Sequence, residues 1–306
     1  MRDRAAGRAR AVLAFWGLVL LGAAVSCSST PERQDPPPPV AMHHVKLGER
    51  YMERGQWAEA VEQLELAEQI APHSYTVLMA LGRAYAGRGW HERALDAFER
   101  AERLWPETGE AALQIGRILI GKNLLDDAHA ALDRAIEQNP RYAAPHFWKG
   151  VAYVAQGRND LAHEQYRLAI QKDPQYHDAY INLGLLEQQN GFYEIAERHY
   201  RTALTIDPRS FLARANLGFN YLDQKRWERG AAELERALEL DPRSVPVLLA
   251  LGIAYENMQR LEAARDCYRR ALALDGSNAQ ARQRLALVEQ RLRAPKPSLT
   301  DPPRQR

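Results

Sequence analysis

Few residues in this sequence stand in a pattern that could do chemistry. Its nine histidines are scattered. His163 precedes Glu164, but no second histidine follows at the distance that a zinc-hydrolase helix requires. The sequence contains no glycine-rich phosphate-binding loop, serine-nucleophile motif or dinucleotide-binding fingerprint. We therefore predict a protein that is not an enzyme, with no catalytic residue, no metal site and no cofactor.

The two cysteines lie in very different surroundings. Cys267 stands next to Tyr268 in an amphipathic stretch, which predicts a packed and unreactive thiol. Cys27 follows a basic start and the uncharged residues 11–25 (AVLAFWGLVLLGAAV), a run shorter than the ~20 residues of a membrane-spanning helix. A basic start, a short apolar core and then small residues are typical of a secretory signal peptide, here residues 1–26.

Residues 24–27 (AVSC) resemble the lipobox of bacterial lipoproteins, in which the cysteine is lipidated and becomes the mature N-terminus. The resemblance implies a lipid on Cys27, and Ser28 after it implies the periplasmic face of the outer membrane. The same residues suit ordinary signal peptidase, which would leave a soluble periplasmic protein with a free Cys27. An uncleaved membrane anchor is a third alternative. Residues 27–40, with prolines at 36–39, would form a stiff linker.

Helical spacing organises the rest of the chain. In residues 75–108 one apolar stripe recurs at i, i+3, i+4 and i+7 and predicts an α-helix, with Leu78, Leu81, Gly82 and Tyr85. A second stripe predicts another helix, with Ala94, Phe98 and Ala101. Glycines at 87 and 89 provide a turn between the two, and Pro106 ends the second helix. The unit is therefore two antiparallel helices.

The same pattern returns every 34 residues, without insertion, from residue 41 to residue 278. Period and pattern resemble the tetratricopeptide repeat (TPR), and the resemblance implies an all-α superhelical solenoid of seven helix-turn-helix repeats. The predicted repeats are residues 41–74, 75–108, 109–142, 143–176, 177–210, 211–244 and 245–278. Residues 279–293 predict an unpaired C-terminal capping helix, and the proline-rich residues 294–306 predict a disordered tail.

One face of each first helix points away from the packing stripe, and tetratricopeptide arrays bind their partners on this face. In the first three repeats the face mixes charged and apolar residues, and from the fourth repeat it becomes more apolar. The predicted partner-binding residues lie in the apolar half: Phe147, Val151, Ile181, Asn182, Leu185, Asn216, Phe219, Leu222, Leu249 and Ile253. The alternative is that neighbouring repeats bury much of this strip themselves.

Asn182 and Asn216 each precede a Leu-Gly pair. This resembles repeats in which a ladder of asparagines holds an extended peptide backbone. An amide side chain can both donate to and accept from a peptide unit. The resemblance implies contacts with the main chain of a client; the alternative is an asparagine bonded to water or to its own helix.

The formal net charge is only +2, and its positive part lies in the two termini, so that the repeats themselves are acidic. An acidic array gives no electrostatic reason to expect nucleic acid. Residues 279–306 offer too little chain for a catalytic domain, which disfavours an enzyme fragment. The predicted partners are therefore a protein or peptide client, and the membrane through the N-terminal lipid.

The plan of lipobox, short linker and repeats nearly to the end resembles the pilotin-type lipoproteins of type IV pilus biogenesis. That resemblance implies an outer-membrane scaffold whose groove captures an apolar segment of a secretin subunit and assists secretin assembly. The alternative, with the same fold, is an envelope adaptor for peptidoglycan-remodelling or polysaccharide-export enzymes. The sequence hardly separates the two clients.

Overall fold

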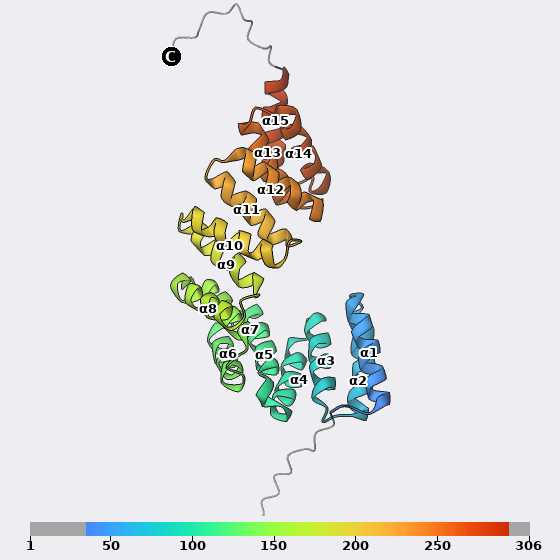
Figure 1. Cartoon of the computed structure of the whole chain (residues 1–306). Helices are drawn as coiled ribbons and strands as arrows, with labels where there is room; N and C mark the ends of the chain where they lie inside the picture. Colours follow the sequence, from blue (N-terminus) through green and yellow to red (C-terminus); the bar gives the residue numbers. More distant parts are fainter. Residues whose placement is uncertain (1–34, 294–306) are drawn as a thin grey trace, which may run out of the picture. The chain divides into compact units, whose positions relative to one another are not determined.

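The computed structural model describes residues 35–293, and all regular structure in this part of the chain is helical. Fourteen α-helices form seven hairpins, which can be followed by colour in Figure 1. The hairpins are α1 (Pro39–Glu53) with α2 (Trp57–Ile70), α3 (Tyr75–Gly87) with α4 (His91–Leu104), α5 (Glu110–Gly121) with α6 (Leu125–Gln138), α7 (Ala143–Ala155) with α8 (Asn159–Lys172), α9 (His177–Gln189) with α10 (Tyr193–Ile206), α11 (Phe211–Asp223) with α12 (Trp227–Leu240), and α13 (Val245–Asn257) with α14 (Leu261–Leu274). A 3₁₀ helix, η1 (Pro106–Thr108), precedes α5, and α15 (Ala279–Arg293) packs on α14. The predicted all-α fold of seven repeats and a capping helix is confirmed.

The predicted signal peptide, Cys27 and the predicted tail lie outside the described residues. Among the helices between residues 35 and 293, none is both long and apolar enough to cross a membrane. Helix α1 begins at Pro39, before the predicted end of the linker at residue 40. Proline is favoured in the first turn of a helix because the amide it lacks would have no partner there.

Asp35 fixes the segment before α1 to the second repeat. Its carboxylate accepts hydrogen bonds from Ser74 Oγ (2.9 Å), Tyr75 N (2.6 Å) and Thr76 N (3.2 Å). These groups lie at the start of α3, where unpaired amides and the positive end of the helix dipole favour a carboxylate. The chain therefore enters the repeats beside the start of α3.

A close contact between a glycine of the first helix and a large residue of the second joins the two helices of every hairpin. The pairs are Gly48–Leu64, Gly82–Phe98, Gly116–Leu132, Gly150–Tyr166, Gly184–Tyr200, Gly218–Leu234 and Gly252–Tyr268. A Cβ atom added at any of these glycines would lie 2.4–2.7 Å from the facing side chain. Only a residue without a side chain fits at this distance, so the glycine sets how closely the helices approach.

Tyrosines near the ends of first helices bind glutamates of the preceding repeat. Tyr85 Oη donates to Glu65 (2.9 Å), and Tyr221 Oη donates to Glu197 (2.8 Å). Arg226 stacks on the Tyr221 ring at 4.7 Å and also pairs with Glu197 at 3.1 Å. Burial and the hydrogen bond to Glu65 raise the pKa of Tyr85 to about 12, so the phenol keeps its proton. These contacts connect successive repeats.

Two departures from the repeat pattern have a local reason. Glu187 replaces the tyrosine of the fifth repeat, and its carboxylate lies 2.9 Å from His163 Nε2 of the preceding repeat, so that a contact between the repeats is kept. Gly230 replaces an alanine of the sixth repeat. A Cβ atom there would lie 2.3 Å from Leu222 Cδ2, so the glycine makes room for this leucine.

Gly184→Ala is expected to lower the unfolding temperature, because its Cβ would lie 2.6 Å from the ring of Tyr200. Overpacking of this kind costs about 1–3 kcal/mol. Gly121→Ala is the matched control, since no atom lies within 4 Å of its added Cβ and alanine favours a helix. Thermal unfolding followed by circular dichroism compares the variants, and an unchanged unfolding temperature for Gly184→Ala would contradict the close-contact argument.

Candidate functional site

One face of the first-type helices carries apolar side chains at 34-residue spacing. We call these five residues the apolar row: Val151 on α7, Leu185 on α9, Phe219 on α11, Ile253 on α13 and Leu287 on α15. Leu185 and Leu287 keep 39% and 49% of their surface exposed, and the other three side chains are partly exposed. Apolar side chains left in water on successive helices form the kind of surface that marks an interaction site.

Contacts between helices make the row continuous from α9 to α15. Helix α9 packs on α11, and α11 packs on α13. Arg284 Nη1 of α15 lies 3.2 Å from Glu256 Oε1 of α13, so an ion pair joins these two helices. Two exposed side chains, Val154 of α7 and Leu212 of α11, add apolar surface on the same helices. Leu287 was absent from the predicted set, because the apolar pattern of α15 also suited a helix that only caps the array.

The structure buries two of the predicted partner-binding residues. Phe147 and Ile181 keep only 8% and 5% of their surface exposed. The rings of Phe147 and Tyr176 lie 5.2 Å apart between centroids. Both residues stand one helical turn before a member of the row, and this position packs into the core. The accessible strip is therefore narrower than predicted, and these two side chains are packing residues.

Leu222 and Leu249 are partly used in packing as well. Leu222 fills the space beside Gly230, and both leucines, like Phe219 of the row, pack against the core of the last two repeats. Each keeps part of its surface exposed. They flank the apolar row, so burial by neighbouring elements, the alternative left open by the sequence, applies to part of the strip.

The two predicted backbone-binding asparagines, Asn182 and Asn216, each stand three residues before a member of the row, and both are partly exposed. Burial raises the pKa of Tyr166 to about 12, and a hydrogen bond from the Asn182 side chain partly offsets this rise. An amide offers two donor hydrogens and two acceptor sites, so this bond leaves Asn182 capacity for a ligand.

In the first three repeats the same face also carries charged residues, and those around Arg83 pair with one another. Arg83 lies 3.6 Å from Glu49 and 3.8 Å from Glu110. Arg117 stacks on the Trp148 ring at 4.7 Å and so covers the end of the apolar half. Sequence reasoning missed this stacking, because an arginine and a tryptophan 31 residues apart give no signal unless the packing of neighbouring repeats is known.

Several histidines of the middle repeats are packed among other side chains. His146 is 8% exposed, and its Nδ1 lies 3.0 Å from Gln165 Oε1. His129 stacks on Tyr153 with 4.2 Å between ring centroids. Burial lowers the pKa of His129, His146 and His199, because a protonated ring would lose its hydration there. These rings are therefore held neutral as packing groups.

The remaining candidates for chemistry are unreactive or dispersed. Burial raises the pKa of the Cys267 thiol to about 11, so almost no thiolate exists at neutral pH. Between residues 35 and 293, no group of three or more histidine, cysteine, aspartate and glutamate side chains is arranged to hold a metal ion.

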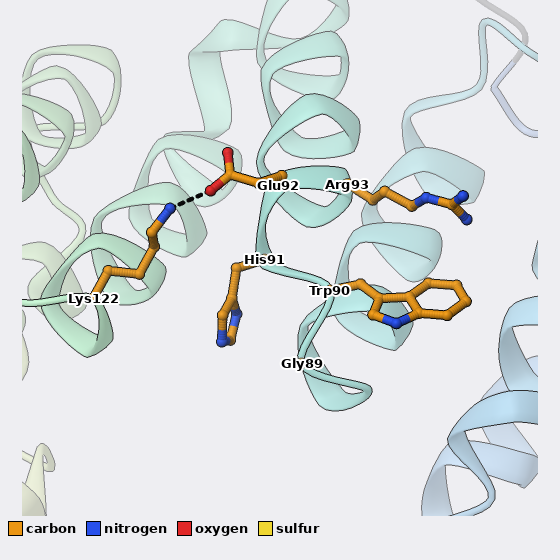
Figure 2. Close-up of a pocket in the computed structure, with 6 residues that line it drawn as sticks. All are labelled: Gly89, Trp90, His91, Glu92, Arg93 and Lys122. Atoms are coloured by element: carbon orange, nitrogen blue, oxygen red, sulfur yellow. Dashed lines mark hydrogen bonds and ion pairs between the residues drawn. The ribbon is translucent and has the colours of Figure 1, made fainter.

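A pocket of about 450 Å³ lies at the turn between α3 and α4, and none of its lining residues belongs to the apolar row. Figure 2 shows Lys122 and Glu92 joined by an ion pair on one side, with Trp90 and Arg93 on the other. Arg88 and Arg93 stack on Trp90 at 4.2 and 4.7 Å, and Lys122 lowers the pKa of Glu92. The charged groups of this pocket pair with one another or with the ring, and no serine, threonine or cysteine lines it.

Sequence comparison agrees with this architecture. A tetratricopeptide repeat model matches residues 45–108, 113–177 and 181–245, and a second one matches residues 221–288. The chain belongs to the tetratricopeptide repeat family. Proteins built from these repeats are typically scaffolds that bind peptide or protein partners. Comparison with curated proteins gives no match.

Solved structures share the fold at low identity. A chain of the APC/C hetero-tetramer Cut9–Hcn1 is 18% identical with a TM-score of 0.65, and the match covers 83% of this chain and 50% of that one. YrrB, described as a TPR protein with an unusual peptide-binding site, is 18% identical with a TM-score of 0.51, and the match covers 62% of this chain and 97% of YrrB. PilF of Pseudomonas aeruginosa is 23% identical with a TM-score of 0.54, and the match covers 61% of this chain and 91% of PilF. At these identities the likeness shows the fold alone.

His146→Leu is expected to make unfolding less sensitive to acid. The unfolded chain takes up a proton at this histidine near pH 6.5, whereas burial lowers the pKa of His146 in the folded chain. Its contribution to stability is therefore fully present above about pH 6.5 and falls as the pH drops towards the lower folded pKa.

Unfolding temperatures at about pH 7.5 and about pH 5 test this linkage. Between about pH 7.5 and about pH 5, the unfolding temperature of His146→Leu should fall by fewer degrees than that of the wild type. The exposed His91 provides the control, since His91→Leu should keep the wild-type dependence. An equal fall in unfolding temperature in all three proteins would show that the buried ring of His146 does not contribute to the acid sensitivity of unfolding.

Proposed function

We propose that this chain is a non-enzymatic scaffold that binds an apolar segment of a client protein along the apolar row. The observation that carries the proposal is that Leu185 and Leu287 are exposed within the apolar row, whose five residues lie on five helices. Full burial of one leucine side chain contributes about 1.5–3 kcal/mol. Leu185 and Leu287 expose less than half of their surface, so covering each of them gains a fraction of this energy, and a client segment sums such gains along the row.

The surroundings of the row suit an apolar peptide in particular. Asn182 and Asn216 flank it with amides that can bond a peptide main chain, whatever the client's side chains are. Arg117 and Trp148 lie at the end of the apolar half, where the polar face of the first repeats begins. The client segment therefore occupies the face of repeats four to seven and α15, and the charged first repeats contribute little to its affinity.

We further propose that the protein works at the periplasmic face of the outer membrane, held there by a lipid on Cys27. The support is the pattern of signal peptide and lipobox in the sequence. A lipid at Cys27 would anchor the repeats to the membrane.

Within this setting we propose an assembling secretin subunit of a type IV pilus system as the client. The support is the order of lipobox, linker and repeats, together with a likeness of fold to PilF of Pseudomonas aeruginosa. A scaffold that covers an apolar segment during assembly prevents that segment from aggregating. The lipid anchor would bring the covered segment to the outer membrane.

Leu185→Arg is expected to abolish capture of the client, because a charged side chain within the row would have to be desolvated on binding. Phe192→Arg is the matched control. Phe192 is also a large exposed apolar residue of the fifth repeat, 54% exposed, but it lies at the turn before α10, outside the row. The measurement is a cross-linked pull-down from detergent-solubilised envelope, quantified by mass spectrometry.

One outcome is that a secretin or other pilus component is lost from the pull-down with Leu185→Arg and retained with Phe192→Arg. This result would support both the apolar row as the binding surface and the pilus component as the client. Capture of cell-wall or polysaccharide-export enzymes instead would contradict the pilus client and leave the row intact. Equal capture by both variants would show that the client binds elsewhere.

Cys27→Ala is expected to move the protein from the membrane fraction to the soluble periplasmic fraction, because alanine cannot be acylated. Fractionation of cells that express the wild type or the variant, followed by immunoblotting, measures this partition. Ser28→Ala provides the control, since it leaves the thiol in place and should remain in the membrane fraction. Unchanged partitioning of Cys27→Ala would rule out the lipid anchor.

A further inference from the structure

The capping helix α15 extends the apolar row and places positive charge beside it. Leu287 is 49% exposed, although it lies on the helix that closes the last hairpin. Arg284 and Arg291 stand three residues before it and four residues after it, so all three side chains share one face of the helix. A client that covers Leu287 therefore approaches both guanidinium groups.

These two arginines share a single carboxylate. Glu256 of α13 lies 3.2 Å from Arg284 and 3.8 Å from Arg291, and it also accepts a hydrogen bond from Tyr268. The Glu256 side chain is 11% exposed, whereas those of Arg284 and Arg291 are 35% and 42% exposed. Because the one buried carboxylate of Glu256 faces two guanidinium groups, the surface around Arg284 and Arg291 keeps an excess of positive charge.

The rest of α15 increases this excess. The helix also carries Arg282 and Arg293, and its single acidic residue, Glu289, is bound by Arg269 of α14 at 2.7 Å. Elsewhere along the row the balance is opposite. On this face α7, α9 and α11 hold no lysine or arginine, and they carry two carboxylates: Asp223, which is exposed, and Asp178, which is partly exposed and lies 3.1 Å from His177 Nε2. Two arginines therefore lie at the α15 end of the apolar row and carboxylates lie near its middle, while a single arginine, Arg117, lies at the α7 end and is stacked on Trp148.

We infer that the client segment is an apolar stretch that ends in acidic residues, and that this acidic end lies against α15 at Arg284 and Arg291. The inference rests on the proposed function, since it names the chemistry and direction of what the row binds. An acidic end would be repelled by Asp178 and Asp223 and attracted by the arginines of α15. The two arginines of α15, compared with the one stacked arginine at the α7 end, therefore favour this direction of the client along the row.

The test uses the full chain in detergent and a phage-displayed library of random peptides as the probe. Selected peptides should combine an apolar stretch with aspartate or glutamate at one end, enriched about threefold or more over the input library. Their affinity should fall about three- to tenfold in the double variant Arg284→Gln, Arg291→Gln, as expected for the loss of one or two partly exposed ion pairs.

Arg236→Gln on α12 is the control, because Arg236 is 58% exposed and pairs with Glu233, outside the row. Its affinity for the selected peptides should equal that of the wild type. Since the double variant also removes the partners of Glu256, the salt dependence of wild-type binding provides a second measurement. Raising the salt from about 0.05 to about 0.5 M should weaken acidic-ended peptides more than their amidated, asparagine-ended versions.

The outcomes distinguish a failure of this inference from a failure of the proposed function. Apolar peptides without acidic enrichment, or with enriched lysine and arginine, would overturn the role of α15 and leave the row as the binding surface. Peptides that bind Leu185→Arg as well as the wild type would overturn the row itself. Acidic-ended peptides whose affinity is unchanged in the double variant would place the acidic end away from α15.

Discussion

The close contact between a glycine of the first helix and a bulky residue of the second is the constraint on which the rest of this structure depends. At Gly150 and Gly184 the ring of a tyrosine lies where a Cβ would have to be. Two helix backbones can approach this closely only where one of them has no side chain. Because the contact recurs at the same place in all seven hairpins, each hairpin presents the same faces to its neighbours.

That regularity decides which apolar residues remain in water. Once the side of a first helix that carries the glycine is packed, the sequence position of every other residue decides what surrounds its side chain. Residues one turn apart on that helix can therefore have different surroundings. Ile181 is buried in the core, whereas Leu185 on the next turn is 39% exposed. The apolar row is thus a consequence of hairpin packing. It persists along the chain because the period of 34 residues returns the same position to the same face.

The sequence predicts the hairpins well because their signals are local: a stripe at helical spacing, a glycine and a turn all lie within one repeat. It predicts the binding surface less well, because burial depends on contacts between repeats. Phe147 and Val151 are both apolar and on one side of α7, and only the neighbouring elements distinguish the buried residue from the accessible one. The stacking of Arg117 on Trp148 likewise depends on the packing of two repeats.

Affinity and direction come from different parts of the same surface. Apolar contact is non-directional, so a row of similar side chains would bind a segment in either direction and in several registers. Partly exposed charges contribute little energy, yet their sign changes along the face, from Asp223 on α11 to Arg284 and Arg291 on α15. A reversed segment would bring its acidic end to the α7 end of the row, where the one stacked arginine Arg117 lies in place of the two arginines of α15. The apolar row therefore determines how tightly a client is held, and the charges of the capping helix determine which way it lies.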